Sequence, residues 1–195
     1  MKKKLIGFSF LGVLLVLIGC STTKSVYVKQ GYESQPKMVK RIKIIVESSQ
    51  EDPQLSNLVA HLATDIIKLK RNYLIYGFRI SKESCFKNCD NLDGVVLFKV
   101  GKVKNDKVKA ELEIKAELYD CYTKNLVWQA IGWDRRESAD EDLANLTSVY
   151  HERFPEAARI FAAPAFVIIQ DLIKTMPNPS LNDQEILKKI ELEGR

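Results

Sequence analysis

The chain has 195 residues, of which 46% are hydrophobic and 28% charged, and its formal net charge is +5. These proportions are typical of a globular protein with enough apolar material for one core. Lys2, Lys3 and Lys4 supply three of the positive charges, and no acidic residue lies among the first 19, so residues 20–195 carry a net charge of only +2. A nearly neutral chain offers no electrostatic basis for binding nucleic acid.

The first 20 residues have the layout of a secretory signal. Three lysines precede the uncharged apolar run Leu5–Ile18, whose 14 residues fall short of the roughly 20 that a membrane-spanning helix needs. The segment ends in Leu17-Ile18-Gly19-Cys20, which resembles the bacterial lipobox. The alternative is an uncleaved anchor helix with an incidental cysteine at its end.

The lipobox resemblance implies a lipid anchor on Cys20. It implies that residues 1–19 are a signal peptide cut before Cys20, that the thiol takes a diacylglyceryl group, and that the new amino terminus is acylated. Two or three acyl chains would hold the protein at a membrane essentially permanently. Ser21 stands where an Asp would indicate inner-membrane retention. The resemblance thus implies the outer membrane, with the domain facing the periplasm; the inner membrane and the cell surface are the alternatives.

Three cysteines follow Cys20, namely Cys85, Cys89 and Cys121. Export to an oxidising compartment makes a disulfide the default expectation. The simplest pairing is Cys85 with Cys89, leaving Cys121 unpaired, although a bond from either to Cys121 would stabilise the fold more, by about 4 rather than about 2 kcal/mol in the loop-entropy model. The sequence does not decide between these pairings.

The sequence predicts no metal, cofactor or catalytic site. A metal site needs more ligands than one C-x3-C pair, and His61 and His151 lie far from it along the chain. There is no Gly-rich phosphate loop, no G-x-S-x-G and no pair of neighbouring histidines. His61 falls beside an apolar helical stripe, which is typical of a solvated or edge histidine.

Residues 20–38 are predicted to be a tether, because Ser, Thr, Lys and Gly dominate them. Within them, Val26–Val28 could dock as an edge strand. The alternation over Lys40–Val46 predicts a strand. Asp52 and Pro53 then predict the start of a helix whose apolar residues form one stripe through Ile66.

A second strand is predicted over Tyr73–Ile80, and a nearly continuous apolar run over Val95–Val100 predicts a central strand. Val108–Tyr119 alternates most regularly, with apolar residues toward the core and lysines and glutamates toward water. Because those glutamates alternate with lysines, a solvated surface is favoured over a general acid/base pair. Leu126–Trp133 is the last predicted strand.

The remaining elements are predicted to be helical. Ser138-x-x-Glu141 resembles a capping box for a helix through Tyr150. A longer helix is predicted over Pro155–Met176, with a kink at Pro164, and residues 181–195 are predicted to be a helical or loose tail. Together these elements predict one α/β (α+β) domain over residues 39–180: a two-layer, mixed and mainly antiparallel sheet of about five strands, with helices mainly on one face.

Three segments resemble the CsgG/LpoB/PelC group of outer-membrane lipoproteins. These are Lys40–Val46 followed by a long helix, Asp93–Leu97 before a long alternating strand, and the hairpin Leu118–Trp128. The chain is also similar to small lipoprotein families of unknown function near that group. The resemblance implies a non-enzymatic accessory for envelope assembly or transport that binds an envelope protein. An envelope-modifying enzyme and a subunit of a secretion complex are the alternatives.

The two tryptophans are candidate contacts for such a partner. Trp128 and Trp133 are five residues apart on one predicted strand, so that their side chains point to opposite sheet faces in a regular strand. One ring would then lie on the uncovered face, beside Val127, Ala130 or Ile131 according to register. Two alternatives remove this exposed ring: a bulge at Gly132 that turns both rings inward, or a C-terminal tail that covers the site.

Overall fold

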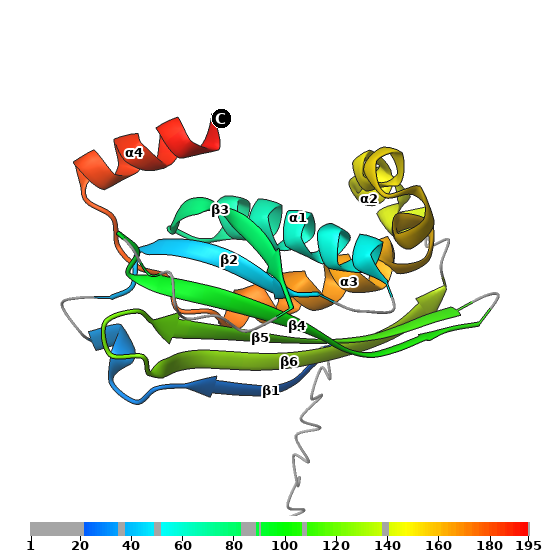
Figure 1. Cartoon of the computed structure of the whole chain (residues 1–195), viewed down its shortest axis with the longest axis horizontal. Coiled ribbons are helices and arrows are strands. Elements are labelled where there is room, and N and C mark those ends of the chain that lie inside the picture. Colours follow the sequence, from blue (N-terminus) through cyan, green and yellow to red (C-terminus); the bar gives the residue numbers. More distant parts are fainter. Residues whose placement is uncertain are drawn as a thin grey trace, which may run out of the picture.

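The computed structural model describes residues 22–34, 38–48, 52–82, 89, 91–106, 109–137 and 141–194. In these ranges the chain forms one six-stranded sheet in the order β1-β6-β5-β4-β2-β3 (Figure 1). The elements are β1 (Thr23–Val28), the 3-10 turn η1 (Tyr32–Ser34), β2 (Arg41–Glu47), α1 (Pro53–Lys70), β3 (Leu74–Ser81), β4 (Gly94–Asn105), β5 (Lys109–Asp120), β6 (Leu126–Glu137), α2 (Glu141–Arg153), α3 (Pro155–Thr175) and α4 (Asp183–Glu193).

The sheet is mixed but mainly antiparallel. β2 lies between β3 and β4 and runs parallel to both. β4, β5, β6 and β1 pair antiparallel in turn. A parallel pair needs a crossover connection, and α1 supplies it between β2 and β3. The predicted two-layer α/β fold is therefore confirmed, with one strand more than expected.

The core lies between the sheet and the helices α1 and α3, which lie side by side behind it in Figure 1. α1 begins as predicted, since the Asp52 side chain accepts a hydrogen bond from the Leu55 N–H at 2.9 Å and Pro53 opens the first turn. On β5 the alternate residues Ala110 to Leu118 are buried and face the helices. The alternation in this strand thus identified the covered face correctly.

The expectation that the opposite face of β5 is solvated is wrong for two of its carboxylates. Glu111 and Glu117 are only 9% and 4% exposed. Each forms an ion pair on that face, Glu111 with Lys102 and Glu117 with Lys115. Each of these buried carboxylates therefore has a cationic partner.

A small second apolar cluster also lies on the face away from the helices. β2 and β4 bury alternate residues in the main core, and the intervening Ile45, Val95 and Leu97 form this cluster with Leu92 and Cys121. The cluster lies where β4 begins. At this end, apolar residues are therefore buried on both faces of the sheet. The helices cover one face, and the small cluster lies on the other.

The predicted tether over residues 20–38 is not a free linker over its described part. Thr23–Val28 forms β1, which pairs with β6, so the edge-strand alternative for Val26–Val28 is confirmed. The Thr22 hydroxyl donates to Asp171 Oδ2 at 2.9 Å, and Thr22 O accepts the Trp133 N–H at 3.0 Å. These contacts hold the chain against α3 and β6 from its first described residue.

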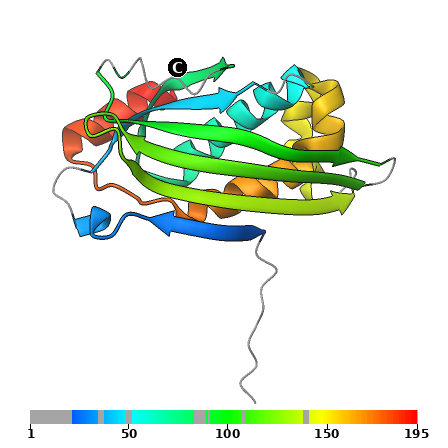
Figure 2. The ribbon, with the colours of Figure 1, turned by 60° about the horizontal axis from the view of Figure 1, so that its bottom comes forward.

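The predicted C-terminal tail is the helix α4, which begins with a capping box between Asn182 and Glu185. Figures 1 and 2 both show α4 and β1 on opposite sides of the molecule. Among the described residues, no helix is both long and apolar enough to cross a membrane.

Candidate functional site

A groove of about 960 Å³ opens at the end of the sheet where β2 and β4 begin. The turn between β5 and β6 and the first turns of α4 form its walls. Its lining combines charged, aromatic and apolar side chains: Met38, Val39, Lys40, Arg41, Leu74, Tyr76, Asp93, Asp120, Tyr122, Thr123, Asn182, Gln184, Glu185 and Lys188.

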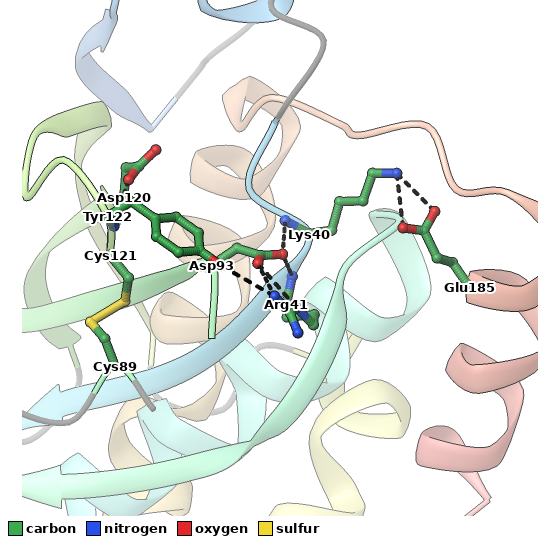
Figure 3. Close-up of polar contacts among 8 residues, drawn as sticks. All are labelled: Lys40, Arg41, Cys89, Asp93, Asp120, Cys121, Tyr122 and Glu185. Carbon is green, nitrogen blue, oxygen red and sulfur yellow. Dashed lines mark hydrogen bonds and ion pairs between the residues drawn. A yellow bond between two sulfur atoms is a disulfide. The ribbon is translucent and has the colours of Figure 1, made fainter. Parts of the chain in front are cut away.

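Asp93 fixes the floor of this groove. Its Oδ2 accepts hydrogen bonds from the backbone N–H groups of Lys40 at 3.2 Å and Arg41 at 2.9 Å (Figure 3). Its Oδ1 accepts from the Arg41 guanidinium, from Nε at 3.0 Å and Nη2 at 2.6 Å. Burial alone would raise the pKa of Asp93, but the hydrogen bonds and charge of Arg41 outweigh it and hold this pKa below its usual range.

The turn between β5 and β6 presents an aromatic ring over the groove. Asp120 Oδ1 accepts the N–H groups of Tyr122 and Thr123, both at 2.8 Å, which is an Asx-type turn. Lys124 closes the turn in the left-handed region at a φ of 60°. The Tyr122 side chain remains 73% exposed, and its hydroxyl lies 3.4 Å from Arg41 Nη2, which donates to it.

The disulfide beside this turn joins Cys89 to Cys121, across 32 residues of sequence (Figure 3). The predicted pair Cys85–Cys89, with Cys121 unpaired, is therefore wrong; Cys85 itself lies outside the described residues. The sheet explains the correct pairing. The Cys121 N–H donates to Asp93 O, and the Leu92 N–H donates to Cys89 O, so the end of β5 and the segment before β4 meet at one place.

α4 contacts the rest of the domain through its polar side chains. Glu185 accepts a bidentate pair from Lys40 Nζ at 3.0 and 2.8 Å (Figure 3), and Lys189 Nζ donates to Arg71 O at 2.7 Å. The hydrogen bond from Lys40 lowers the pKa of Glu185. No side chain of this fully described helix is buried.

The apolar side chains of α4 face solvent instead. Ile186, Leu187 and Ile190 are 45%, 68% and 62% exposed. An amphipathic helix normally turns such residues toward the core. α4 thus has the reverse arrangement: its charged residues hold it in place and its aliphatic residues are exposed. Ile186 and Ile190 line a separate hollow with Asn72, whereas α4 contributes only polar residues to the groove.

The described residues of the groove form no recognisable catalytic set. The three cations in its described lining are paired with carboxylates, Lys40 with Glu185, Arg41 with Asp93 and Lys188 with Glu191. In the described ranges no group of three His, Cys, Asp or Glu side chains could hold a metal ion. His61 lies elsewhere, partly buried against Phe78 and Phe154, with ring centroids at 4.8 and 5.2 Å, and burial lowers its pKa.

The two candidate tryptophans lie on opposite faces, as predicted. Trp128 is fully buried under α3, where its Nε1 donates to Thr175 Oγ1 at 3.1 Å. Trp133 lies partly exposed on the other face, where Nε1 donates to Glu111 at 3.3 Å and Lys24 Nζ lies 5.4 Å from the ring centroid. The alternative of a bulge at Gly132 is wrong, because Gly132 pairs regularly with Ile114. Trp133 is distant in the fold from the groove.

The remaining candidate, Cys20, lies outside the described residues, so its lipidation stays a prediction. The sequence did single out Lys40–Val46, Asp93 and the 118–128 hairpin, but only as structural motifs. It did not identify the groove, since Lys40 and Glu185 are 145 residues apart in the chain. The signal that could have found α4 is the amphipathic pattern of residues 181–195.

The sequence matches no known family model, and none of the curated proteins shows significant similarity. Several solved structures are similar in chain course. A PelC dodecamer from Paraburkholderia phytofirmans has 12% identity and a TM-score of 0.44, over 71% of this chain and 89% of that one. Lipoprotein GNA1162 from Neisseria meningitidis has 13% identity and a TM-score of 0.39, over 60% of this chain and 99% of that one. A DUF330 protein from Xanthomonas campestris has 12% identity and a TM-score of 0.40, over 69% and 81%. We assign no residue a role from these similarities.

Proposed function

We propose that this protein is a lipid-anchored, non-enzymatic accessory of the cell envelope that binds another protein through α4 and the neighbouring groove. The proposed attachment is the lipid on Cys20, and the proposed address is the periplasmic side of the outer membrane. The observation that carries the binding role is the exposure of Ile186, Leu187 and Ile190 on α4. Clustered exposed apolar side chains rimmed by polar groups are typical of protein-interaction sites.

The groove on the other side of α4 offers a second contact surface, with aromatic rings. Tyr76 and Tyr122 line it and are 40% and 73% exposed. Tyrosine is enriched at binding hot spots because its ring contributes a large contact area at a small entropic cost. The ion pairs Lys40–Glu185 and Arg41–Asp93 hold the walls in place, so a partner would meet a surface that is already ordered.

The composition of the groove favours binding over catalysis. Among the described residues that line it there is no His, Ser or Cys, and thus neither a Ser–His nor a Cys–His pair for covalent catalysis. Two of its three described carboxylates, Asp93 and Glu185, have a lowered pKa because cations hold them ionised, whereas a general acid needs a raised one. An envelope-modifying enzyme is accordingly the less supported alternative.

Site-specific photocrosslinking in the native host tests this function. A photoreactive amino acid is placed at Leu187 in the full-length chain, and a matched control is placed at Arg159, which is exposed near the start of α3. We expect a discrete crosslinked protein at Leu187 and none at Arg159. Ile190→Glu in the Leu187 chain should abolish that product, because it places a charge in the apolar contact.

The same experiment can contradict the proposal. Identical product patterns at Leu187 and Arg159, or a Leu187 product that Ile190→Glu leaves unchanged, would mean that α4 is not a specific binding surface. Because the side chains of Leu187 and Ile190 are exposed, neither substitution should impair folding, and circular dichroism of the purified variants checks this.

A further inference from the structure

The edge strand β1 carries a second exposed apolar surface, far from α4. Val26, Tyr27 and Val28 are consecutive and are 46%, 47% and 37% exposed. β1 is the outermost strand of the sheet and pairs only with β6 among the described strands. An uncovered apolar edge strand is normally a liability that proteins protect with charges or with a covering element. We therefore expect a molecule or segment outside the described residues to cover β1.

The position of the anchor cysteine identifies the cover. Cys20 is two residues before Thr22, so at most about 7 Å of extended chain separates their Cα atoms. Thr22 is itself fixed to α3 and β6 by its bonds to Asp171 and to the Trp133 N–H. No tether remains between a lipid on Cys20 and the folded domain. A bilayer holding that lipid must therefore lie against the side of the domain where β1 begins.

We propose that the outer edge of β1, with Val26, Tyr27 and Val28, rests on the surface of the membrane to which Cys20 is attached. This inference rests on the proposed lipid anchor. The chemistry of the strand fits the interfacial region, because tyrosine is favoured there and Lys29 follows the three residues, while Lys24 on their other side is ion-paired with Glu113. Since no described strand pairs with the outer edge of β1 at Val26–Val28, the hydrocarbon interior would be unfavourable for its backbone groups, and the strand lies at headgroup depth.

This orientation gives the molecule a membrane side and a partner side. β1 and β3 are the two edge strands of the sheet. In both Figure 1 and Figure 2, β1 forms one border of the molecule, and α4 lies at one end of the sheet on the side of β3. With β1 on the membrane, α4 then lies on the side of the domain away from it. The proposed binding surface is then presented to a partner in the space beside the membrane.

A depth measurement on the lipidated full-length protein tests the orientation. In a Cys85→Ser background, the environment-sensitive fluorophore NBD is attached to Tyr27→Cys, or to Leu69→Cys as the control on α1, where the wild-type side chain is 80% exposed. The protein is reconstituted into vesicles of phosphatidylethanolamine and phosphatidylglycerol that contain headgroup-labelled nitroxide lipid. We expect several-fold stronger quenching and a blue-shifted emission at position 27, and water-like emission at position 69.

Each other outcome has a separate meaning. If the protein floats with the vesicles but positions 27 and 69 are quenched alike, the orientation is wrong while the anchor stands. If the protein does not float with the vesicles, the anchor itself fails and the orientation fails with it. If position 27 is already blue-shifted in the unlipidated Cys20→Ala chain without vesicles, a second copy of the chain covers β1, and this too overturns the inference.

Discussion

Asp93 shows how one side chain organises the end of the sheet. Its carboxylate accepts four hydrogen bonds from Lys40 and Arg41, which precede and begin β2, while the residue itself immediately precedes β4. The side chain is only 17% exposed, so these bonds replace water that the folded protein has displaced. Asp93 thus joins two parallel neighbours at the floor of the groove.

Asp93→Asn should destabilise the fold at neutral pH. We expect a loss of about 2 kcal/mol, since hydrogen bonds to charged groups contribute about 1.5–3 kcal/mol each and the amide retains part of them. The lowered pKa of Asp93 means that its stabilisation is present above the unfolded pKa of about 3.9 and is lost as the pH falls through the folded value. Urea unfolding at about pH 7 and about pH 2.5 should therefore show a smaller deficit at the lower pH.

Glu191→Gln is the matched control for this change. Glu191 forms an i,i+3 pair with Lys188 on α4, and its side chain is 48% exposed. Exposed pairs contribute about 0–1 kcal/mol, so the control should hardly move the midpoint. A pH-independent deficit for Asp93→Asn, or an equal deficit for both variants, would show that the charge of Asp93 is not what matters.

At the scale of single residues, the sequence predicted local partners and missed distant ones. The Asp52 cap and the opposite faces of Trp128 and Trp133 follow from spacings of a few residues, and both are confirmed. The partners of Asp93 and Glu185 are 52 and 145 residues away. No periodicity encodes such pairs, because they depend on which elements the topology brings together.

At the scale of elements, β6 and α3 approach each other most closely at Gly132. A Cβ added there would lie 2.7 Å from Ile168 Cγ2 and 3.2 Å from Leu172 Cδ2. Both side chains are fully buried, and the Ile168 methyl cannot swing away as the end of a long chain would. The glycine is therefore required by helix packing rather than by a bulge.

Gly132→Ala should destabilise the domain by about 1–3 kcal/mol through overpacking. Gly101→Ala is the control, since an added Cβ would meet only the side chain of Glu113, whose nearest atom is the terminal Oε1 at 3.1 Å. Thermal unfolding of both variants provides the measurement. Equal melting temperatures would mean that α3 does not pack on β6 as closely as described.

The Cys89–Cys121 disulfide should stabilise the domain by about 3–4 kcal/mol, the value expected for a closed loop of this length in the entropy model. Cys121→Ser should lose that amount in urea unfolding under non-reducing conditions, whereas Cys85→Ser should lose little. Peptide mapping should recover Cys89 linked to Cys121. Recovery of Cys89 linked to Cys85 would contradict the pairing.

The elements that the sequence predicted well are those whose own pattern decides them. α1, α3 and β5 have long, regular periodicities, and each lies where the pattern placed it. The two ends of the chain, residues 22–34 and 181–194, were ambiguous because their patterns are short. Tertiary contacts decide the structure of these two segments. A hydrogen bond from Thr22 to Asp171 fixes the chain where β1 begins, and a hydrogen-bonded ion pair between Lys40 and Glu185 holds α4.

At the scale of the whole molecule, the proposed membrane contact on β1 and the proposed partner contact on α4, which contacts β3, lie toward opposite edges of one sheet. Neither side could be assigned from the sequence, which presents β1 and α4 only as terminal segments. The folded domain gives both a fixed position, so an anchor at Cys20 would orient the groove as well as retain the protein.

The most direct test of this account is the fate of the chain when Cys20 is replaced. Wild-type protein and Cys20→Ala are expressed in the native host, fractionated, and analysed by intact-mass spectrometry. We predict that the wild type sediments with membranes and has the mass of residues 20–195 plus acyl chains, whereas Cys20→Ala is soluble in the periplasm or retains residues 1–19. A Cys20→Ala chain that matures and sediments with membranes exactly as the wild type does would contradict the account.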